Sequence, residues 1–149
     1  MRILFLGDIV GPSGCNVVKR FLPDIIKKKD LDFVVANGEN AADSGLGITE
    51  KISKELFNCG IDVLTTGNHV WDQKETAEHI EKEKKLLRPY NLTSPSPGKG
   101  FEIFSSKNNF KIGVLNLMGN VFMKKCDDVF IKIEKFLNNY DLKKNYDFL

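Results

Sequence analysis

The chain is poor in the residues that mark several classes of protein. Its 149 residues include only three cysteines, Cys15, Cys59 and Cys126, which stand far apart and form no Cys-x-x-Cys pair. An odd number of scattered cysteines argues against a disulfide framework or a zinc ribbon, and it is typical of small buried thiols in a reducing compartment. We therefore expect a cytoplasmic protein.

Long apolar runs and a strong charge excess are missing as well. No apolar stretch approaches the roughly 18 residues of a membrane span, so no membrane partner is expected. Met1-Arg2 leads directly into the first predicted strand, which leaves no room for a signal peptide. The formal net charge is only +2, with Lys and Glu mixed along the chain, and this does not favour nucleic-acid or membrane binding.

What the chain does contain is an alternation of strand and helix patterns that ends in a hairpin. This order predicts an α/β fold, with a mostly parallel sheet and flanking helices, in one domain over residues 1–149. The predicted strands are Arg2–Leu6, Phe33–Ala36, Asp62–Leu64, Leu86–Arg88, Phe101–Ser105 and Phe110–Leu117, and the predicted helices are Asn16–Lys28, Thr49–Asn58, Gln73–Lys84 and a last one through Leu137.

Local signals place several boundaries. Pro23 lies inside the first helical pattern and should kink or restart that helix. Thr49 is the expected N-cap of the second helix, and Gly60 follows its end. The third helix should open on a capping box of Asp72 and Glu75, and the last should be capped by Asp127 or Asp128. The stretch 93–100, rich in Ser, Pro and Gly, predicts a loop.

Three of the predicted strands lead into polar residues that can bind metal. The first leads through Gly7 to Asp8, the second to Glu39 and Asn40, and the third to Asn68 and His69. Asp8, Glu39 and Asn68 are separated by 31 and 29 residues, about the length of a strand–helix–strand unit. Because parallel strands present their carboxyl ends to one crevice, these side chains should converge on one edge of the sheet.

The first of these segments, residues 7–14, has three interpretations. Its glycines could cradle a pyrophosphate at a helix N-terminus, as in a nucleotide-binding module, although the spacing does not match Gly-x-Gly-x-x-Gly and no Lys-Ser/Thr pair follows. It could be a tight turn with Asp8 solvated. It could also present Asp8, fixed at a strand end, as a hard oxygen ligand, and this metal interpretation fits the other two segments.

The second and third segments each have a purely structural interpretation as well as a functional one. Glu39 could hold two ions about 3.5–4 Å apart, one on each oxygen, or it could lie in an ordinary turn. An amide ligand at Asn68 leaves the neighbouring imidazole free, so His69 could protonate a leaving alkoxide, or it could be a hydrogen-bonded loop residue. His79 lies among glutamates and is interpreted as solvated, while residues 43–48 should form a loop at the rim of the site.

These residues carry a resemblance to a known family. The pattern Gly-Asp, Gly-Glu-Asn and Gly-Asn-His resembles the calcineurin-like metallophosphoesterases, and Gly-Glu-Asn-Ala-Ala, Gly-Asn-His-Val-Trp-Asp and Met-Gly-Asn-Val-Phe-Met are similar to the YmdB-like bacterial phosphodiesterases. The resemblance implies a metallophosphoesterase sandwich that hydrolyses 2′,3′-cyclic nucleotides or related phosphodiesters with two divalent ions, Fe, Mn or Mg. It implies Asp8 and Glu39 at the first ion, Glu39 and Asn68 at the second, Asn40 beside them, and His69 as general acid.

The chain departs from that family towards its C-terminus. The family continues into an Asp-Phe-His motif and a later Gly-x-His-x-His motif, whereas His69 and His79 are the only histidines here. Residues 146–149 resemble the start of the strand that leads into the first of these motifs. We therefore expect the N-terminal portion of a longer domain, lacking its histidine-bearing half.

Three functions remain open. The chain could be a phosphodiesterase, incomplete on its own. It could be an inactive truncated remnant or interaction module, which self-associates or binds a separate C-terminal half. It could also be a nucleotide-binding module that uses the glycine-rich first loop.

Overall fold

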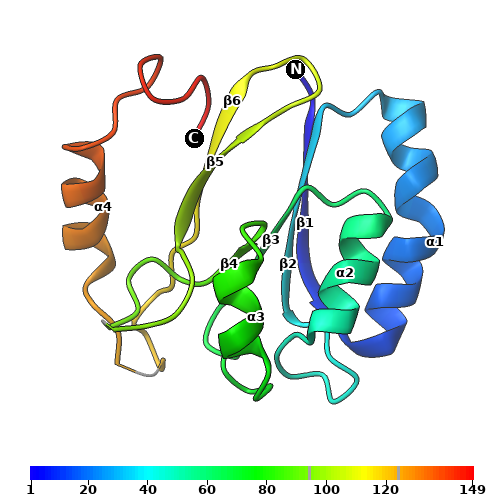
Figure 1. The fold of residues 1–149 in the computed structure, drawn as a ribbon, viewed down its shortest axis with the longest axis horizontal. Coiled ribbons are helices and arrows are strands. Elements are labelled where there is room, and N and C mark those ends of the chain that lie inside the picture. The colour runs from blue at the N-terminus through cyan, green and yellow to red at the C-terminus, as the bar shows by residue number, and fades with distance from the viewer. Residues whose placement is uncertain (94, 124) are drawn as a thin grey trace.

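The structure, a computed structural model, describes residues 1–93, 95–123 and 125–149. Its centre is a parallel sheet of four strands in the order β1-β2-β3-β4, so each strand neighbours the one that precedes it in the chain (Figure 1). The strands are β1 (Ile3–Val10), β2 (Phe33–Asn40), β3 (Val63–Thr65) and β4 (Leu86–Leu87). The α/β fold with a parallel sheet is confirmed.

Three helices cover one face of this sheet and bury the larger core. They are α1 (Gly11–Lys29), α2 (Glu50–Asn58) and α3 (Thr76–Lys82). Figure 1 shows α1 and α2 beside each other, and Ile80 of α3 belongs to the same apolar core. Alternate side chains of each strand point towards the helices, because successive residues of a strand face opposite sides of the sheet. This core includes Leu22, Val34, Ala36, Leu56, Leu64, Ile80 and Leu86.

A hairpin covers part of the opposite face. Strands β5 (Phe101–Ser105) and β6 (Lys111–Leu115) pair antiparallel, and their side chains pack on a second apolar cluster of the parallel sheet. This cluster contains Phe33, Val35, Val63 and Leu87 of the parallel sheet together with Ile112 of β6. Beyond the hairpin lies α4 (Val129–Leu137), whose Phe136 ring lies 4.6 Å from that of Phe101. The layers are therefore helix, sheet, hairpin and helix.

The first helix differs from its prediction. It begins at Gly11, five residues earlier than the predicted Asn16, and continues without interruption through Pro23. Proline is well tolerated in the first turn of a helix, so Pro12 permits the early start. Since β1 ends at Val10, the strand meets the helix directly. The glycine-rich segment therefore forms no loop that could cradle a phosphate.

The capping predictions are partly confirmed. The Thr49 hydroxyl accepts from the Ile52 N–H, and Asp128 rather than Asp127 accepts at the start of α4. The predicted capping box of Asp72 and Glu75 is wrong, because α3 begins only at Thr76 and its N-terminus has no side-chain cap. Of the predicted loop 93–100, residue 94 lies outside the described residues.

One face of β1 remains uncovered by the hairpin. Ile3 and Phe5, which pair in register with Phe33 and Val35, have exposed fractions of 44% and 64%. Near the end of the chain, Phe148 forms an isolated parallel bridge with Ile112 of β6, and no strand is assigned to the described residues 146–149. In the described part of the chain, no helix is both long and apolar enough to cross a membrane.

Candidate functional site

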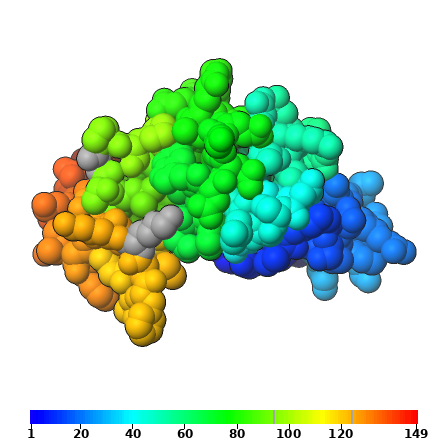
Figure 2. All heavy atoms as spheres, turned by 90° about the horizontal axis from the view of Figure 1, so that it is seen from below, coloured from blue at the N-terminus to red at the C-terminus, as the bar shows by residue number. Residues whose placement is uncertain are grey.

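The predicted site residues lie at the carboxyl edge of the parallel sheet. Strands β1 and β2 run further than predicted, so Asp8, Glu39 and Asn40 belong to the ends of the strands themselves rather than to loops after them. Asn68 and His69 follow β3 in a short turn. Figure 2 views the molecule from this end and shows the blue, cyan and green segments adjoining one another. The segments that carry the predicted residues are therefore neighbours at this edge.

Asp8 is tied to β2 by a side-chain hydrogen bond. The Asn40 Nδ2 donates to the Asp8 Oδ2 at 2.8 Å. Asp8 itself pairs in register with Asn37, between two irregularities of the β1–β2 ladder. Such irregularities re-aim side chains at the end of a strand. They let Asp8 and Asn40 meet although the two strands are otherwise in regular parallel register.

Glu39 is tied to the segment after β3 by close packing. A Cβ placed on Gly67 would overlap the Glu39 Oε2 and lie 2.6 Å from the Glu39 Cδ. The carboxylate therefore lies directly against the Gly67 backbone, in space that any side chain at residue 67 would fill. Asn68 follows immediately and is half-buried. Gly67 thus brings the ends of β2 and β3 together.

Two oxygens at this edge are buried without a partner. Among the described residues, the Glu39 Oε2 and the Asn40 Oδ1 accept no hydrogen bond. Buried polar atoms are almost always paired, so two unpaired oxygens on adjacent residues call for a ligand. Carboxylate and amide oxygens are the donors that hard divalent cations prefer. The donor set at this edge therefore fits a divalent cation.

The donor set is rich in oxygen and poor in nitrogen. Within the described ranges, no group of three or more His, Cys, Asp or Glu side chains is placed to hold a metal ion. Asp8 and Glu39 supply carboxylates, and the remaining predicted ligands, Asn40 and Asn68, are neutral amides. No imidazole joins them in a compact cluster within those ranges.

His69 has a partner that the sequence did not reveal. Its Nδ1 lies 2.6 Å from the Asp72 Oδ2, and both side chains are about one-third exposed. This contact explains why the predicted capping box fails, because the Asp72 carboxylate faces the imidazole. The spacing of three residues between His69 and Asp72 is the available signal in the sequence, whereas the capping-box pattern pairs Asp72 with Glu75. Asp72 fixes the ring and leaves its Nε2 for other contacts.

The turn that carries His69 is anchored on both sides. The buried Asn116, after the hairpin, donates through Nδ2 to the backbone oxygen of Thr66 at 2.7 Å. On the other side, a Cβ on Gly47 would lie 3.3 Å from the His69 carbonyl oxygen, so the predicted rim loop 43–48 packs directly against this turn. Neither contact can be predicted from the spacing of residues in the sequence, because each joins segments that are distant along the chain.

His79 is a correction. The sequence predicted a solvated side chain, but His79 is buried and its Nε2 lies 2.8 Å from the Ser53 Oγ. The Ser53 hydroxyl donates to the Glu50 carbonyl, so it accepts from His79. The glutamates around residue 79 are on the exposed face of α3, whereas His79 packs towards α2. Its contact is with α2, and none of the predicted site residues is its hydrogen-bond partner.

Comparisons with known proteins agree with this architecture. The family model described as YmdB-like protein matches residues 4–149. A 2′,3′-cyclic-nucleotide 2′-phosphodiesterase of Bacillus subtilis is 40% identical over 149 residues, which are 100% of this chain and 56% of that protein. A putative phosphatase/phosphodiesterase of Mycoplasma genitalium is 37% identical over 123 residues, or 80% of this chain and 43% of that protein.

Solved structures show the same fold. A hypothetical protein from Thermus thermophilus superposes with a TM-score of 0.86 at 35% identity, over 95% of this chain and 54% of that one. A structure described as a novel phosphatase, from Mycoplasma pneumoniae, superposes with a TM-score of 0.84 at 30% identity, over 93% and 51%. The chain therefore spans about half the length of the relatives it matches.

Proposed function

The chain belongs to the family of YmdB-like proteins, and from this membership we propose that its sheet edge is a metal-dependent phosphodiesterase centre. The substrate class is a 2′,3′-cyclic nucleotide or a related phosphodiester, by similarity to the Bacillus relative. The observation that carries the proposal is the pair of buried, unpaired oxygens of Glu39 and Asn40 beside Asp8. An edge built only for stability would not leave them without partners.

The ligands are assigned from the positions of the donors. We propose that Asp8 and Glu39 hold a first divalent ion, that Glu39 and Asn68 hold a second, and that Asn40 lies beside them. Such a pair of ions supplies an activated water and neutralises charge on the phosphodiester. Oxygen donors without imidazole favour Mg²⁺ or Mn²⁺ over Fe²⁺ in this half of the site. Asn40 and Asn68 can also orient phosphate oxygens.

His69 is the proposed general acid. The Asp72 carboxylate at Nδ1 fixes the ring, so Nε2 is the nitrogen from which His69 would donate a proton. Cleavage of the P–O bond leaves a ribose alkoxide, which takes this proton. Asp72 is a positioning residue in this scheme, because it acts on the substrate only through His69.

Completion of the site by further polypeptide is part of the proposal. Residues 1–149 would form the N-terminal portion of one metallophosphoesterase domain, and the uncovered Ile3 and Phe5 would receive a separate C-terminal half or a second copy. The alternative function, an inactive interaction module, is favoured by the same exposed face. Free cysteines are compatible with a cytoplasmic location.

Metal titration and hydrolysis assays test the proposal together. The purified chain should bind Mn²⁺ weakly by calorimetry and hydrolyse 2′,3′-cyclic AMP slowly, because each ion receives few protein ligands. Adding the C-terminal half of the Bacillus relative should raise both the affinity for Mn²⁺ and the rate of hydrolysis. His69→Ala should then abolish hydrolysis while Mn²⁺ still binds. Turnover by the chain alone at an ordinary enzymatic rate of about 1 per second or faster would contradict the incomplete site.

A further inference from the structure

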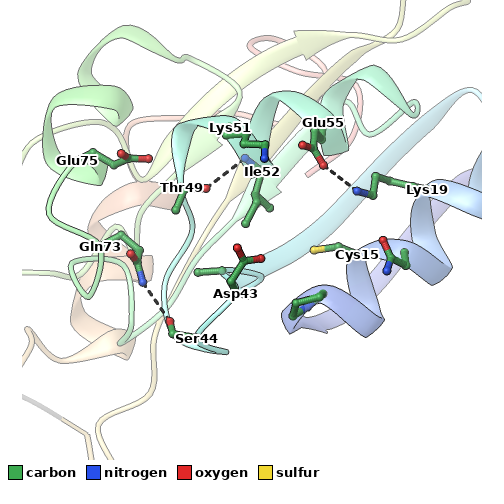
Figure 3. Close-up of a pocket in the computed structure, with 13 residues that line it drawn as sticks. Cys15, Lys19, Asp43, Ser44, Thr49, Lys51, Ile52, Glu55, Gln73 and Glu75 are labelled. Carbon is green, nitrogen blue, oxygen red and sulfur yellow. Dashed lines mark hydrogen bonds and ion pairs between the residues drawn. The ribbon is translucent and has the colours of Figure 1, made fainter.

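A pocket of about 690 Å³ lies on the helix side of the sheet (Figure 3). The first turns of α1, the loop after β2 and the start of α2 form its walls. None of the proposed metal ligands, nor His69, is among its described lining residues. Its volume falls within the usual range for small-molecule sites, about 300–1,000 Å³. It is therefore a second candidate site.

One pair of charges in the pocket neutralises itself. The Lys19 Nζ lies 2.7 Å from the Glu55 Oε2. This hydrogen bond raises the pKa of Lys19 and lowers that of Glu55, so both groups are charged and paired. The pair closes the α1–α2 side of the pocket and leaves little charge for a ligand there.

Asp43 and Lys51 are different, because both side chains are exposed and neither has a salt-bridge partner within the described residues. Beside the larger effect of Lys19, Lys51 contributes only a longer-range attraction that lowers the pKa of Glu55. The remaining carboxylate of the lining, Glu75, accepts from the Glu50 N–H. Among the residues that the structure describes, neither side chain makes an ion pair or a hydrogen bond, although both line the pocket. Figure 3 shows Asp43 on the wall formed by the loop and Lys51 on the wall formed by α2. A carboxylate and an ammonium therefore face the same space without meeting.

The two walls are held in place by other contacts. The Gln73 Nε2 donates to the Ser44 Oγ at 3.2 Å and to the Leu46 carbonyl at 2.7 Å, which fixes the loop next to Asp43. The Thr49 hydroxyl caps α2 two residues before Lys51. A preformed separation of charges reduces the ordering that a ligand must induce on binding.

Between these charges the pocket has an apolar side. Pro12, Cys15, Ala42 and Ile52 supply it, and Cys15 and Ala42 are buried. A ligand with an uncharged body and polar ends would therefore contact matching surface along its whole length. Small-molecule sites commonly combine an apolar lining with a few placed polar groups.

From this arrangement we propose that the pocket binds a small molecule with a nitrogen donor group at one end and an anionic group at the other. The donor, an amine, guanidine or amino-bearing base, contacts the Asp43 carboxylate, and the anion contacts the Lys51 ammonium. Two sources share this chemistry: an amino acid with a basic side chain, and a nucleoside monophosphate with an amino-bearing base. The described lining residues differ from the proposed metal ligands and from His69, so this inference does not rest on the proposed phosphodiesterase function.

Calorimetry with two probes tests the site. L-Arginine and adenosine 3′-monophosphate are titrated into the 149-residue chain with a chelator present, so that metal at the sheet edge does not contribute. At least one probe should bind, and Asp43→Asn and Lys51→Gln should each weaken it by about tenfold or more, as expected for loss of a charge-assisted contact. Binding of L-arginine would identify the ligand as a basic amino acid, and binding of adenosine 3′-monophosphate would identify it as a nucleotide.

Ligands that carry only one end of the nucleotide, and matched variants, complete the test. Adenosine and inorganic phosphate should each bind more weakly than the nucleotide if the two ends act together. Asp24→Asn and Lys28→Gln, exposed on α1 outside the pocket, and Asp8→Asn at the sheet edge should leave binding unchanged. Absence of binding by both probes at millimolar concentration overturns the proposal. So does binding that persists in Asp43→Asn and Lys51→Gln, because the ligand would then lie elsewhere.

Discussion

At the scale of single residues, the candidate site depends on Gly67, which has no side chain. The Glu39 carboxylate lies in the space that a Cβ on Gly67 would fill, and its Oε2 has no partner among the described residues. The His69 ring, in turn, is held by Asp72. Each of these two side chains is thus positioned by a neighbour that is itself no ligand, which is how metal and catalytic residues are commonly oriented.

Gly67→Ala should weaken metal binding more than it weakens the fold. The added methyl group would displace the Glu39 carboxylate, and a displaced ligand of this kind should cost about 10–100-fold in Mn²⁺ affinity, measured by calorimetry alongside thermal unfolding. Gly7→Ala is the matched control, since no atom lies within 4 Å of its added Cβ. Shortening the clashing side chain, in Gly67→Ala/Glu39→Asp, should recover part of the affinity. Wild-type affinity in folded Gly67→Ala would refute the mechanism.

Asp72→Asn should change the state of the His69 ring without any metal present. In the wild type the Asp72 carboxylate accepts from Nδ1–H, so the neutral ring should carry its proton on Nδ1. Replacing the carboxylate weakens this preference, and nitrogen NMR of the imidazole should show a shift towards the other tautomer. His79, whose Nε2 donates to Ser53, is the internal reference and should not change. An unaltered His69 spectrum would mean that the contact does not form in solution.

At the scale of elements, short polar contacts determine where helices and strands begin. Asp128 accepts from the N–H groups of Phe130 and Ile131 and so starts α4, which packs Phe136 on the hairpin. At the entry to β3, Asp62 accepts from the Val34 N–H and links that strand to β2. These contacts determine where α4 and β3 begin. The rest of each element is specified by its pattern of apolar side chains.

Asp128→Ala should destabilise the chain through loss of the α4 cap. Two N–H groups would lose their acceptor, and an N-cap of this kind contributes about 0.5–2 kcal/mol to the free energy of unfolding. Asp127→Ala provides the comparison, because Asp127 makes a surface ion pair with Lys132 and should matter less. Denaturant unfolding of both variants decides the issue. Equal effects would show that the cap contributes nothing specific.

Asp62 should make the stability of the chain fall as pH rises. Burial raises the pKa of its carboxyl above the ordinary value of 3.8, so the ionised form is disfavoured in the folded state. Its stabilising contribution is therefore complete below pH 3.8 and is lost as pH rises through the higher folded value. Asp62→Asn still offers Val34 an acceptor but cannot ionise. The free energy of unfolding of the wild type should decline relative to this variant over that window, and parallel pH profiles would contradict the assignment.

At the scale of the whole molecule, the two faces of the sheet are unequally covered. Helices α1, α2 and α3 close one face, whereas the hairpin covers β2 to β4 and leaves Ile3 and Phe5 of β1 exposed. The relatives are about twice as long as this chain. An exposed apolar face beside an unpaired strand edge favours association with further polypeptide.

Phe5→Thr should reduce self-association of the chain. Phe5 has an exposed fraction of 64% on this face, and threonine retains strand propensity while removing the ring. Light scattering across a concentration series should show the wild type associating and the variant remaining monomeric. Phe130→Thr, on α4 and 78% exposed, controls for the general loss of an aromatic side chain and should behave as the wild type. A monomeric wild type at high concentration would argue against this interface.

The sequence by itself determined the α/β class, the order of elements and the edge where the site residues gather. These follow from periodicity and from polar residues at the ends of apolar strands, which are local properties of the chain. It also located β5 and the cap at Thr49 correctly, because both depend on neighbouring residues.

Tertiary structure decided the rest. Only packing against α2 buries His79, only the fold of the turn directs Asp72 to His69 instead of to a helix N-terminus, and only strand pairing extends β1 and β2 to Val10 and Asn40. The contact between Glu39 and Gly67 joins segments 28 residues apart, and so does not follow from either local pattern. The metal ligands and the role of His69 remain predictions. Local sequence patterns indicate which residues have the chemistry for metal binding or catalysis, whereas long-range contacts determine which of these residues lie close together.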